Sequence, residues 1–406
     1  MYATLLIVVC GLFAFIAWRD LKTAVLLFCA ALPVYLIRFH IGPIPSTLLE
    51  AFFGILFIIW VIRTHPWHKE ILPRGWALPF GLLVLAGIVS FFVSPDRLAA
   101  LGLFKAYLVE PVFFFLIVRD LFHASEDRTN LLRSLAAGGL FVAAFGIWQF
   151  VTGSGIPVPW DLERRVTGPF PYPNALGLYL APLVVIAALG AWHDVKFRAW
   201  WIAFLLLSGV ALIFSKTEAA WASVPAVVFL LFVREKRFRK QAIAVAACLI
   251  LLVALIPAVR GPVTEKLLLR DLSGQVRIAQ WKDTAAFLKD HPIFGAGLSG
   301  YPIAIEPYHT HPEFEIFQDP HDIVLNIWVE LGLIGLLAAC LIGRNVWRSE
   351  KPDWPALAAS FALLQMVIHG LVDVPFLKND LAMMAFALLA LVASTKKNTR
   401  PGDPSA

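Results

Sequence analysis

The sequence predicts an all-α, polytopic integral membrane protein of about 12 to 13 transmembrane helices, with one large external loop that contains short amphipathic helices. Hydrophobic residues make up 59% of the 406 residues, and the mean hydropathy is +0.76. Charged residues make up 15%, compared with roughly 25% in soluble domains. We therefore expect residues 1–406 to form a single membrane domain in a lipid bilayer, and we exclude a soluble enzyme and nucleic-acid binding.

Apolar segments long enough to cross about 30 Å of hydrocarbon recur along the whole chain. The first has no basic residue ahead of it and no small-residue cleavage site, so we expect a retained helix rather than a signal peptide. The candidate spans lie near residues 1–18, 22–37, 47–62, 76–93, 98–118, 134–151, 174–192, 199–214, 218–233, 240–259, 323–343, 355–373 and 379–395.

Basic residues collect in alternate connections between these segments. The positive-inside rule assigns such connections to the cytoplasm, and it places the C-terminus, with Lys396, Lys397 and Arg400, on the same side. The connections at 152–173 and 260–322 then face the exterior, and the second is the longest in the chain. We expect function to reside in these external loops and in charges that face the bundle interior.

The segment DPHDIVLNIWVELGLIG, residues 319–335, joins the long external loop to the next span. Asp319 suits an N-cap, Pro320 the first helical position and acidic Asp322 the third. His321 is then expected in the first turn, where the positive end of the helix favours neutral imidazole and Asp322 favours the charged form. Two interpretations stay open at this point: an interfacial histidine with a capping acid, or a general base.

The stretch from 273 to 301 predicts a helix on the outer leaflet that ends at Asp290, because Pro292 cannot continue it. Arg277 and Trp281 are four residues apart and share a face. The positive-inside rule leaves few basic residues in external loops, so an external arginine needs a compensating role. It could bind a phosphate or pyrophosphate through its planar fork, or pair with an acid, Asp271 or Asp283. The apolar positions expected to form one face are Ile278, Trp281, Ala285 and Leu288.

Further external cations could surround an anionic group. In DLERRVTGPFPYPNALGLYLAPL, residues 161–183, Arg164 has acidic neighbours, so Arg165 is the spare charge, and Asn174 is expected to cap the next helix. Lys216 and Arg260 are also external, although Lys216 could instead pair with Glu218. A run with His309, His311, Glu313 and Glu315 lacks a specific metal-ligand spacing, so we expect no metal and no other cofactor.

The motifs RVTGPFPYPNALGLYL, RIAQWKDTAAFLKDHPIFGAGLSGY and HDIVLNIWVELGLIG together resemble the O-antigen ligase and polymerase family of bacterial membrane glycosyltransferases, over roughly residues 100–395. The resemblance implies an undecaprenyl pyrophosphate-linked glycan donor and an acceptor sugar, either a lipid A core or a lipid-linked repeat unit. It also implies a site that faces the periplasm from the bacterial inner membrane, without a metal or a nucleotide sugar.

The same resemblance implies roles for individual residues. His321 matches the histidine that acts on the acceptor hydroxyl, Arg277 the loop arginine near the donor pyrophosphate, and Arg165 an arginine of the earlier loop. Asp322 departs from the family, which usually has Asn there, and it is expected to raise the basicity of His321 or to orient its ring. Asp322 is expected to support the site together with Trp281 and Asp319.

The chemistry of the residues agrees with this assignment. Displacing a pyrophosphate from an anomeric carbon needs a base at the incoming hydroxyl and cations on the leaving group. His321 can supply the first, and Arg277, with Arg165, Arg260 and Lys216, the second. No paired external carboxylates suggest a covalent intermediate, so we expect inversion. The motifs do not separate ligase from polymerase, and the alternative from another class is a transporter or flippase of lipid-linked saccharides.

Overall fold

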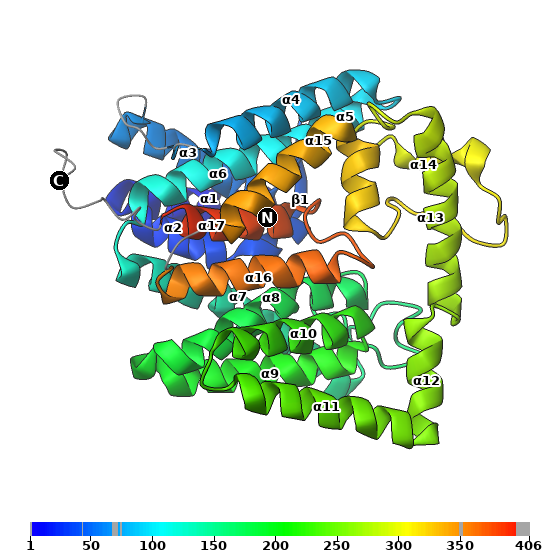
Figure 1. The fold of residues 1–406 in the computed structure, drawn as a ribbon. Coiled ribbons are helices and arrows are strands. Elements are labelled where there is room, and N and C mark those ends of the chain that lie inside the picture. Colours follow the sequence, from blue (N-terminus) through cyan, green and yellow to red (C-terminus); the bar gives the residue numbers. More distant parts are fainter. Residues whose placement is uncertain (1, 43, 67–71, 74, 349–351, 395–406) are drawn as a thin grey trace, which may run out of the picture.

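The computed structural model describes residues 2–42, 44–66, 72–73, 75–348 and 352–394. Most helices run side by side in one bundle, and a layer of further helices crosses one end of it (Figure 1). The elements are α1 (Tyr2–Arg19), α2 (Leu21–Ala30), η1 (Leu32–Leu36), β1 (Arg38–Ile41), β2 (Ile44–Thr47), α3 (Leu48–Thr64), α4 (Ala77–Val93), α5 (Arg97–Leu103), η3 (Phe104–Val109), α6 (Glu110–Leu121), α7 (Ser125–Thr152), α8 (Pro173–His193), η4 (Val195–Phe197), α9 (Arg198–Ser215), α10 (Glu218–Arg234), α11 (Arg239–Leu255), α12 (Pro257–Leu267), α13 (Leu272–Asp290), α14 (Tyr301–Ile305), η5 (Glu306–Tyr308), α15 (Ile323–Trp347), α16 (Trp354–His369) and α17 (Asn379–Ala393).

The predicted all-α membrane class is confirmed. Five described helices are long and apolar enough to cross a bilayer, or six if the bent pair formed by α11 and the segment Arg260–Asp290 counts as one span. Five other apolar helices are 10–17 residues long. Each of the thirteen predicted segments overlaps a helix, but several are shorter than the roughly 20 residues of a full span. The total of 12 to 13 crossings stays a prediction.

Helix α8 forms the centre of the bundle. Its sequence is apolar on every side, as expected for a helix surrounded by other helices, and most of its residues are buried. Small residues allow its neighbours to approach closely. A Cβ on Gly177 would lie 2.4 Å from Thr217 at the start of α10, and one on Gly190 would lie 2.5 Å from Trp201 of α9. Helices α7, α9, α10 and α16 pack around it.

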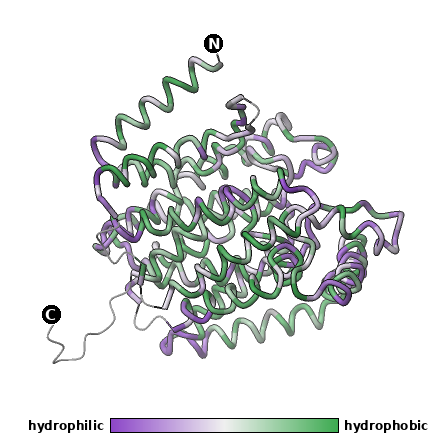
Figure 2. The backbone as a smooth tube through the Cα atoms, turned by 90° about the horizontal axis from the view of Figure 1, so that it is seen from above, coloured by the Kyte–Doolittle hydropathy of each residue, from purple (hydrophilic) through white to green (hydrophobic). Residues whose placement is uncertain are grey.

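The basic connections gather at the end of the bundle opposite the crossing layer (Figure 1). There Lys22 pairs with Asp127 at 2.7 Å, and Arg133 makes a two-pronged ion pair with Asp194. Arg128 pairs with Asp353 at the start of α16. Figure 2 shows hydrophilic stretches toward the ends of the bundle and hydrophobic ones through its body. Lys396, Lys397 and Arg400, on which the expected side of the C-terminus depends, lie outside the described residues.

A short antiparallel hairpin is the exception to the helical architecture. Strands β1 and β2 pair Arg38 with Thr47. Thr47 then begins α3 through a capping box, in which its hydroxyl accepts from the Glu50 N–H at 3.2 Å and Glu50 Oε2 accepts from the Thr47 N–H at 3.1 Å. Glu50 also pairs with Lys105 of the π-helical turn η3 at 3.1 Å. The hairpin therefore links the first spans to the α5–α6 segment.

The long external loop, predicted at 260–322, is mostly ordered into helices α12, α13 and α14, which cross the end of the bundle (Figure 1). Helix α13 ends at Asp290 as predicted, but its predicted apolar face is buried only in part. Leu288 is buried, Ile278 and Trp281 are half-buried, and Ala285 is exposed. The buried face also carries Asp283, Thr284 and Phe287. The polar residues of this face can be buried because the loop after α13 supplies their hydrogen-bond partners. For example, the Thr284 hydroxyl bonds to the Tyr301 hydroxyl at 2.9 Å.

Helix α15 is broken at Gly332, whose φ of 65° and ψ of −169° lie outside the helical region. The loop that follows α13 occupies the break. The Ala296 N–H donates to the Val329 carbonyl at 2.7 Å, and the Leu333 N–H donates to the Ile293 carbonyl at 2.9 Å. The Ser90 hydroxyl of α4 donates to the Glu330 carbonyl. These bonds satisfy backbone groups that the broken helix leaves open, and they fix the first half of α15 to the layer of helices that crosses the end of the bundle.

Candidate active site

Four segments that are distant in sequence meet where the crossing layer joins the bundle. They are the start of α8, the middle of α13, residues 319–322 ahead of α15, and the connection 370–378 between α16 and α17. The Ile323 N–H donates to the Gly370 carbonyl at 2.7 Å, and Asn174 donates to Asp373 at 3.4 Å. Helices α8, α16 and α17 therefore position the same site that the loop between α12 and α15 covers.

His321 lies in this junction and is held by Asp319. The His321 Nδ1 atom is 3.0 Å from Asp319 Oδ1, and the His321 backbone N–H donates to the same oxygen at 3.1 Å. Phe317 contacts the ring, with 5.0 Å between centroids. In the tautomer that donates from Nδ1, the lone pair lies on Nε2, and Nε2 has no hydrogen bond to any described residue. The arrangement leaves a base-competent nitrogen available on a fixed ring.

The carboxylate of Asp319 is suited to this contact. Burial alone would raise the pKa of Asp319, but the hydrogen bonds from His321 and the positive charge of Lys378 hold it below its ordinary value. Asp319 is therefore ionised through the neutral range and can stabilise an imidazolium as it forms. The side chains of His321 and Asp319 are 27% and 24% exposed, so solvent screens the pair only in part.

The predicted helix start is wrong by three residues. Asp322, not Asp319, is the N-cap of α15, because its Oδ1 accepts from the Leu325 N–H at 2.8 Å. His321 precedes the helix with a φ of 49°, in the left-handed region, so it does not occupy the first turn. The expected roles of the two acids are thus exchanged: Asp319 orients the histidine ring, and Asp322 caps the helix. Burial raises the pKa of Asp322 despite its backbone hydrogen bonds.

Trp281 and Arg277 connect α13 to both neighbouring loops. The Trp281 indole N–H donates to the Pro320 carbonyl at 3.0 Å, directly beside His321. One turn earlier, Arg277 Nε donates to the Val372 carbonyl at 3.1 Å. The predicted shared face of these two side chains therefore contacts residues 320 and 372, the two loops that line the junction.

The terminal nitrogens of Arg277 have no carboxylate partner among the described residues. Both acids considered as partners from the sequence are engaged elsewhere. Asp271 pairs with Lys266 at 2.7 Å, and Asp283 accepts from the Thr310 hydroxyl at 2.7 Å. The half-buried Arg277 thus keeps the planar fork that suits a phosphate group.

Arg165 and Lys216 have structural partners. Arg165 donates to the carbonyls of Ser215 and Lys216 at 3.2 and 3.4 Å, at the C-terminal end of α9, and lies 4.9 Å from the Trp160 ring centroid. Burial lowers the pKa of Arg165 although acidic groups nearby oppose the shift. Lys216 donates to the Glu163 carbonyl at 3.1 Å, and its Nζ lies 3.6 Å from the Glu163 carboxylate.

The expected pairing of Lys216 with Glu218 is wrong, since Glu218 pairs with Lys266 at 2.9 Å. Arg260 lies exposed in α12. In the part of the chain that the structure describes, no contact joins Arg165, Arg260 or Lys216 to the His321 and Arg277 junction. The structure therefore does not bring these three cations to the site that His321 and Arg277 share.

Lys378, just before α17, is a residue of the junction that the sequence analysis missed. Its ammonium donates to the Tyr172 hydroxyl and lies 4.7 Å from the Tyr172 ring centroid. Burial would lower the pKa of Lys378, but Tyr172, Asp373 and Asp319 together raise it above its ordinary value. The sequence signal that pointed to Arg277, a basic residue on the side predicted to be external, also applies to Lys378.

Asn174, the predicted cap of α8, is inside that helix instead. Tyr172 is the N-cap and Pro173 is the first helical residue, which leaves the Asn174 amide free to donate to Asp373. The candidate metal run is likewise divided among other partners: His309 lies 3.5 Å from Asp283, and His311 pairs with Glu313 at 3.0 Å. Within the described ranges, no three His, Cys, Asp or Glu side chains converge as metal ligands would.

A comparison with known protein families agrees with the motifs. Residues 202–340 match a family described as O-antigen ligase. Over this stretch the chain is similar to O-antigen ligases. The matched segment runs from α9 into α15 and covers about a third of the chain, so Arg277 and His321 lie within it, whereas Arg165 and Lys378 lie outside. No curated protein matches the chain. The predicted family is thus confirmed, over a shorter stretch than the motifs suggested.

Proposed function

We propose that this O-antigen ligase domain protein transfers a glycan from an undecaprenyl pyrophosphate-linked donor to an acceptor sugar at the outer leaflet, with inversion and without a metal. The observation that carries the proposal is the Asp319-held His321, whose Nε2 has no hydrogen-bond partner among the described residues. It lies in the same junction as Arg277, whose fork has no carboxylate partner there. A base and an anion-binding group are the two parts that this reaction requires.

The proposed reaction is a single displacement. The acceptor hydroxyl attacks the anomeric carbon, the bond from that carbon to the pyrophosphate oxygen breaks, and the hydroxyl proton passes to Nε2 of His321. Negative charge grows on the departing pyrophosphate, where Arg277 stabilises it through two parallel hydrogen bonds. Asp319 stabilises the imidazolium and keeps the ring in place. Attack from the face opposite the leaving group inverts the anomeric configuration.

Lys378 is a second cation at this junction, and we assign it to the electrostatic balance of the site. Its neighbours Asp319 and Asp373 are both acidic, so the ammonium offsets negative charge next to the base. Arg165, Arg260 and Lys216 are left as outer positive charges that attract the anionic donor over longer distances. We further propose that the site faces the periplasm of a bacterial inner membrane.

The test is a reconstituted assay with purified protein, an undecaprenyl pyrophosphate oligosaccharide, a chelator and no ion gradient. Product formed only when a lipid A core is added supports a ligase, and ladders formed from the donor alone support a polymerase. If the donor binds but no glycosidic product forms, transfer is refuted and lipid transport becomes the better explanation.

Arg277 can be tested in the same assay. Arg277→Ala should raise the donor KM by about tenfold or more, and Arg277→Lys should recover only part of the loss, because an ammonium cannot make two parallel hydrogen bonds. Exposed Lys289 on the same helix gives the matched control Lys289→Ala. Equal donor kinetics in wild type and both Arg277 variants would refute the pyrophosphate contact.

A further inference from the structure

A cluster of tyrosines with one lysine and one acid lies beside the candidate base, at the start of α17. Helix α17 packs against both η1 and η3, and the loop ahead of α8 joins them, because the Lys378 ammonium lies 4.7 Å from the Tyr172 ring centroid. Tyr35 and Tyr107 are each close enough to interact electrostatically with Asp380 and Tyr172. We call this group the tyrosine cluster; its members are Tyr35 of η1, Tyr107 of η3, Tyr172, Lys378 and Asp380.

The tyrosine cluster has polar atoms that are left without hydrogen bonds. The hydroxyls of Tyr35 and Tyr107 bond to no described residue, and both side chains are half-buried. Asp380 is 2% exposed, and its carboxylate accepts only from the Leu381 N–H, at 2.9 Å and through Oδ1. Its Oδ2 therefore has no donor among the described residues, and such a buried oxygen is costly. The cluster is suited to a ligand that supplies both donors and acceptors.

The charges of the cluster favour a neutral, hydroxylated ligand. A phosphate would meet three acidic groups, Asp380, Asp373 and Asp319, around the single ammonium of Lys378, and it would be repelled. An apolar ligand would leave the buried Asp380 oxygen unpaired. A sugar hydroxyl can donate to Asp380 while it accepts from Lys378, and the tyrosine rings offer flat apolar surface to the C–H groups of the sugar.

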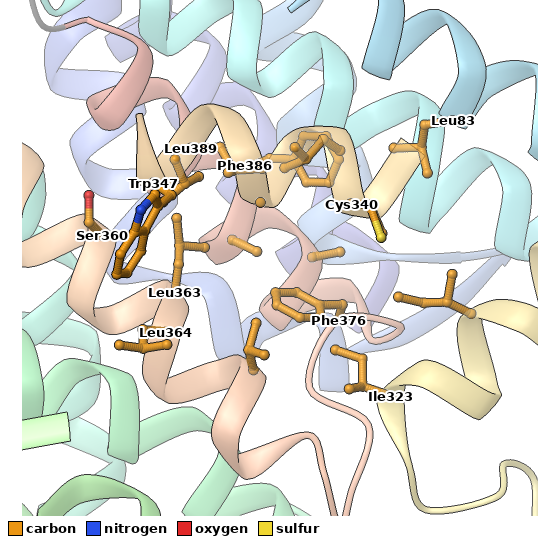
Figure 3. A pocket seen from close by; sticks show the side chains of 18 of the residues that line it. Leu83, Ile323, Cys340, Trp347, Ser360, Leu363, Leu364, Phe376, Phe386 and Leu389 are labelled. Carbon is orange, nitrogen blue, oxygen red and sulfur yellow. The ribbon is translucent and has the colours of Figure 1, made fainter. Parts of the chain in front are cut away.

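The connection between α16 and α17 separates this cluster from an apolar pocket of about 580 Å³. Figure 3 shows Phe376 among the apolar side chains of the pocket, and Leu377 also lines it. The next residue, Lys378, instead donates to the Tyr172 hydroxyl. Tyr107 lies at the boundary, since it lines the pocket and interacts electrostatically with Lys378. The apolar residues therefore anchor the connection and hold Lys378 on the polar side.

The other end of the same connection carries the proposed leaving-group contact. Arg277 Nε donates to the Val372 carbonyl at 3.1 Å, whereas Lys378 lies six residues further on and interacts electrostatically with Asp319, the partner of His321. In an inverting displacement, the incoming hydroxyl and the leaving group lie on opposite faces of the sugar that is transferred. With the pyrophosphate at Arg277, the incoming sugar belongs on the side of Asp319 and Lys378.

We propose that the tyrosine cluster binds the acceptor sugar, with one sugar hydroxyl between Asp380 and Lys378 and others at the hydroxyls of Tyr35 and Tyr107. The inference rests on the proposed function for the reaction, and it adds the residues that select the acceptor. A site built to pair hydroxyls rejects a sugar that lacks one of them, because its own buried polar atoms are then left unpaired.

Direct binding tests the cluster without any transfer. The probes are the deacylated lipid A core oligosaccharide and the free repeat-unit oligosaccharide, each titrated by calorimetry into purified protein in nanodiscs. At least one should bind the wild type with a Kd of about 1 mM or lower. Tyr35→Phe and Tyr107→Phe should each weaken that binding about fivefold, and Asp380→Asn about tenfold or more.

The two tyrosine variants remove hydroxyls that have no partner in the described protein, so their melting temperatures should match that of the wild type. Tyr308→Phe is the matched control, because that hydroxyl donates to Asp290 at 2.7 Å outside the cluster, and it should leave the Kd unchanged. Binding of neither probe to the wild type would overturn the proposal. Equal binding by the wild type, Tyr35→Phe, Tyr107→Phe and Asp380→Asn would overturn it as well.

The transfer assay shows which substrate the cluster selects. The three cluster variants should raise the KM for the acceptor by the same factors and change the KM for the donor less than about twofold. A raised donor KM with an unchanged acceptor KM would assign the cluster to the first sugar of the donor and overturn the proposal. Weakened oligosaccharide binding in the variants, without transfer by the wild type, would refute the transfer reaction and leave the sugar site in place.

A set of monodeoxy acceptors identifies the hydroxyl that donates to Asp380. One of them should lose about tenfold or more in kcat/KM with the wild type and about threefold or less with Asp380→Asn, because the contact is already weakened in that variant. If every deoxy acceptor lost equally with both proteins, Asp380 would not contact the sugar and the proposed site would be wrong.

Discussion

Replacing Asp319 with asparagine tests the proposed dyad most sharply among the single substitutions at the site. Asparagine keeps the size of the side chain and can still accept the hydrogen bond from the His321 backbone, which is 3.1 Å long in the wild type. It removes the charge that stabilises an imidazolium, and its amide can face Nδ1 as a donor and favour the wrong tautomer. We expect a lower kcat with little change in the donor KM.

The size of the effect follows from the geometry. The Nδ1 to Oδ1 distance is 3.0 Å, but both side chains are about one quarter exposed, so the lower part of the range for charged hydrogen bonds applies. A loss of about 2 kcal/mol in the transition state corresponds to a fall in kcat of about 30-fold.

The assay is steady-state transfer in proteoliposomes at neutral pH, with wild type and Asp319→Asn side by side. Glu313→Gln is the matched control, since His311 and Glu313 form a pair of equal 3.0 Å length in the same loop but with greater exposure. An Asp319→Asn protein with wild-type kcat would refute the dyad. A loss of equal size in Glu313→Gln would show a general effect on the loop.

Asp319 also predicts a pH dependence of stability. Its pKa is lowered in the folded protein, so its ionisation favours folding above the ordinary pKa, and that contribution is lost as the pH falls through the lowered value. Between about pH 5 and about pH 3, the wild type should therefore lose more thermal stability than Asp319→Asn. If the melting temperatures of wild type and Asp319→Asn fell equally over this interval, the claim that Asp319 is ionised in the folded protein would be contradicted.

The other predictions concern the supports of the site. Trp281→Phe removes the indole N–H that holds the Pro320 carbonyl and should lower thermal stability by about 1 kcal/mol, with kcat falling more than the donor KM changes; an unchanged kcat would contradict the support. Gly332→Ala would place a Cβ 2.4 Å from a backbone oxygen of the loop after α13, and it should lower the stability measured by thermal melting by more than about 2 kcal/mol. Gly209→Ala is the control, because open space surrounds that position, and it should leave the stability unchanged. Lys378→Met removes the cation near Asp319 and Asp373 and should lower the free energy of unfolding by about 2 kcal/mol, with partial rescue by Lys378→Arg. A Lys378→Met protein with unchanged stability would contradict the role of Lys378 in the site.

Composition and hydropathy were sufficient to predict the helical membrane class, because the bilayer forces backbone groups to bond within each helix. The start of α15 shows the limit of local rules. Both Asp319 and Asp322 fit an N-cap by residue type, and only the left-handed conformation of His321 decides between them. The contact that matters for chemistry, from Asp319 to the ring, follows from that choice and is not visible in the spacing.

Tertiary contacts explain the remaining differences. The buried face of α13 carries Asp283 because Thr310, far along the loop, supplies its hydrogen bond, and helical spacing contains no information about such a partner. Lys378 enters the site because the connection after α16 folds back toward the start of α8, where Tyr172 lies. Arg277 could be predicted because an external arginine is costly without a function. Its fork has no carboxylate partner among the described residues, which agrees with that reasoning.

The measurement that tests the central claim most directly is the transfer rate of His321→Ala beside wild type, in chelator, with donor binding measured on the same preparations. With the general base removed, transfer should fall by about 100-fold or more, while the protein stays folded and the donor still binds. Near-wild-type transfer by His321→Ala would contradict the proposed mechanism.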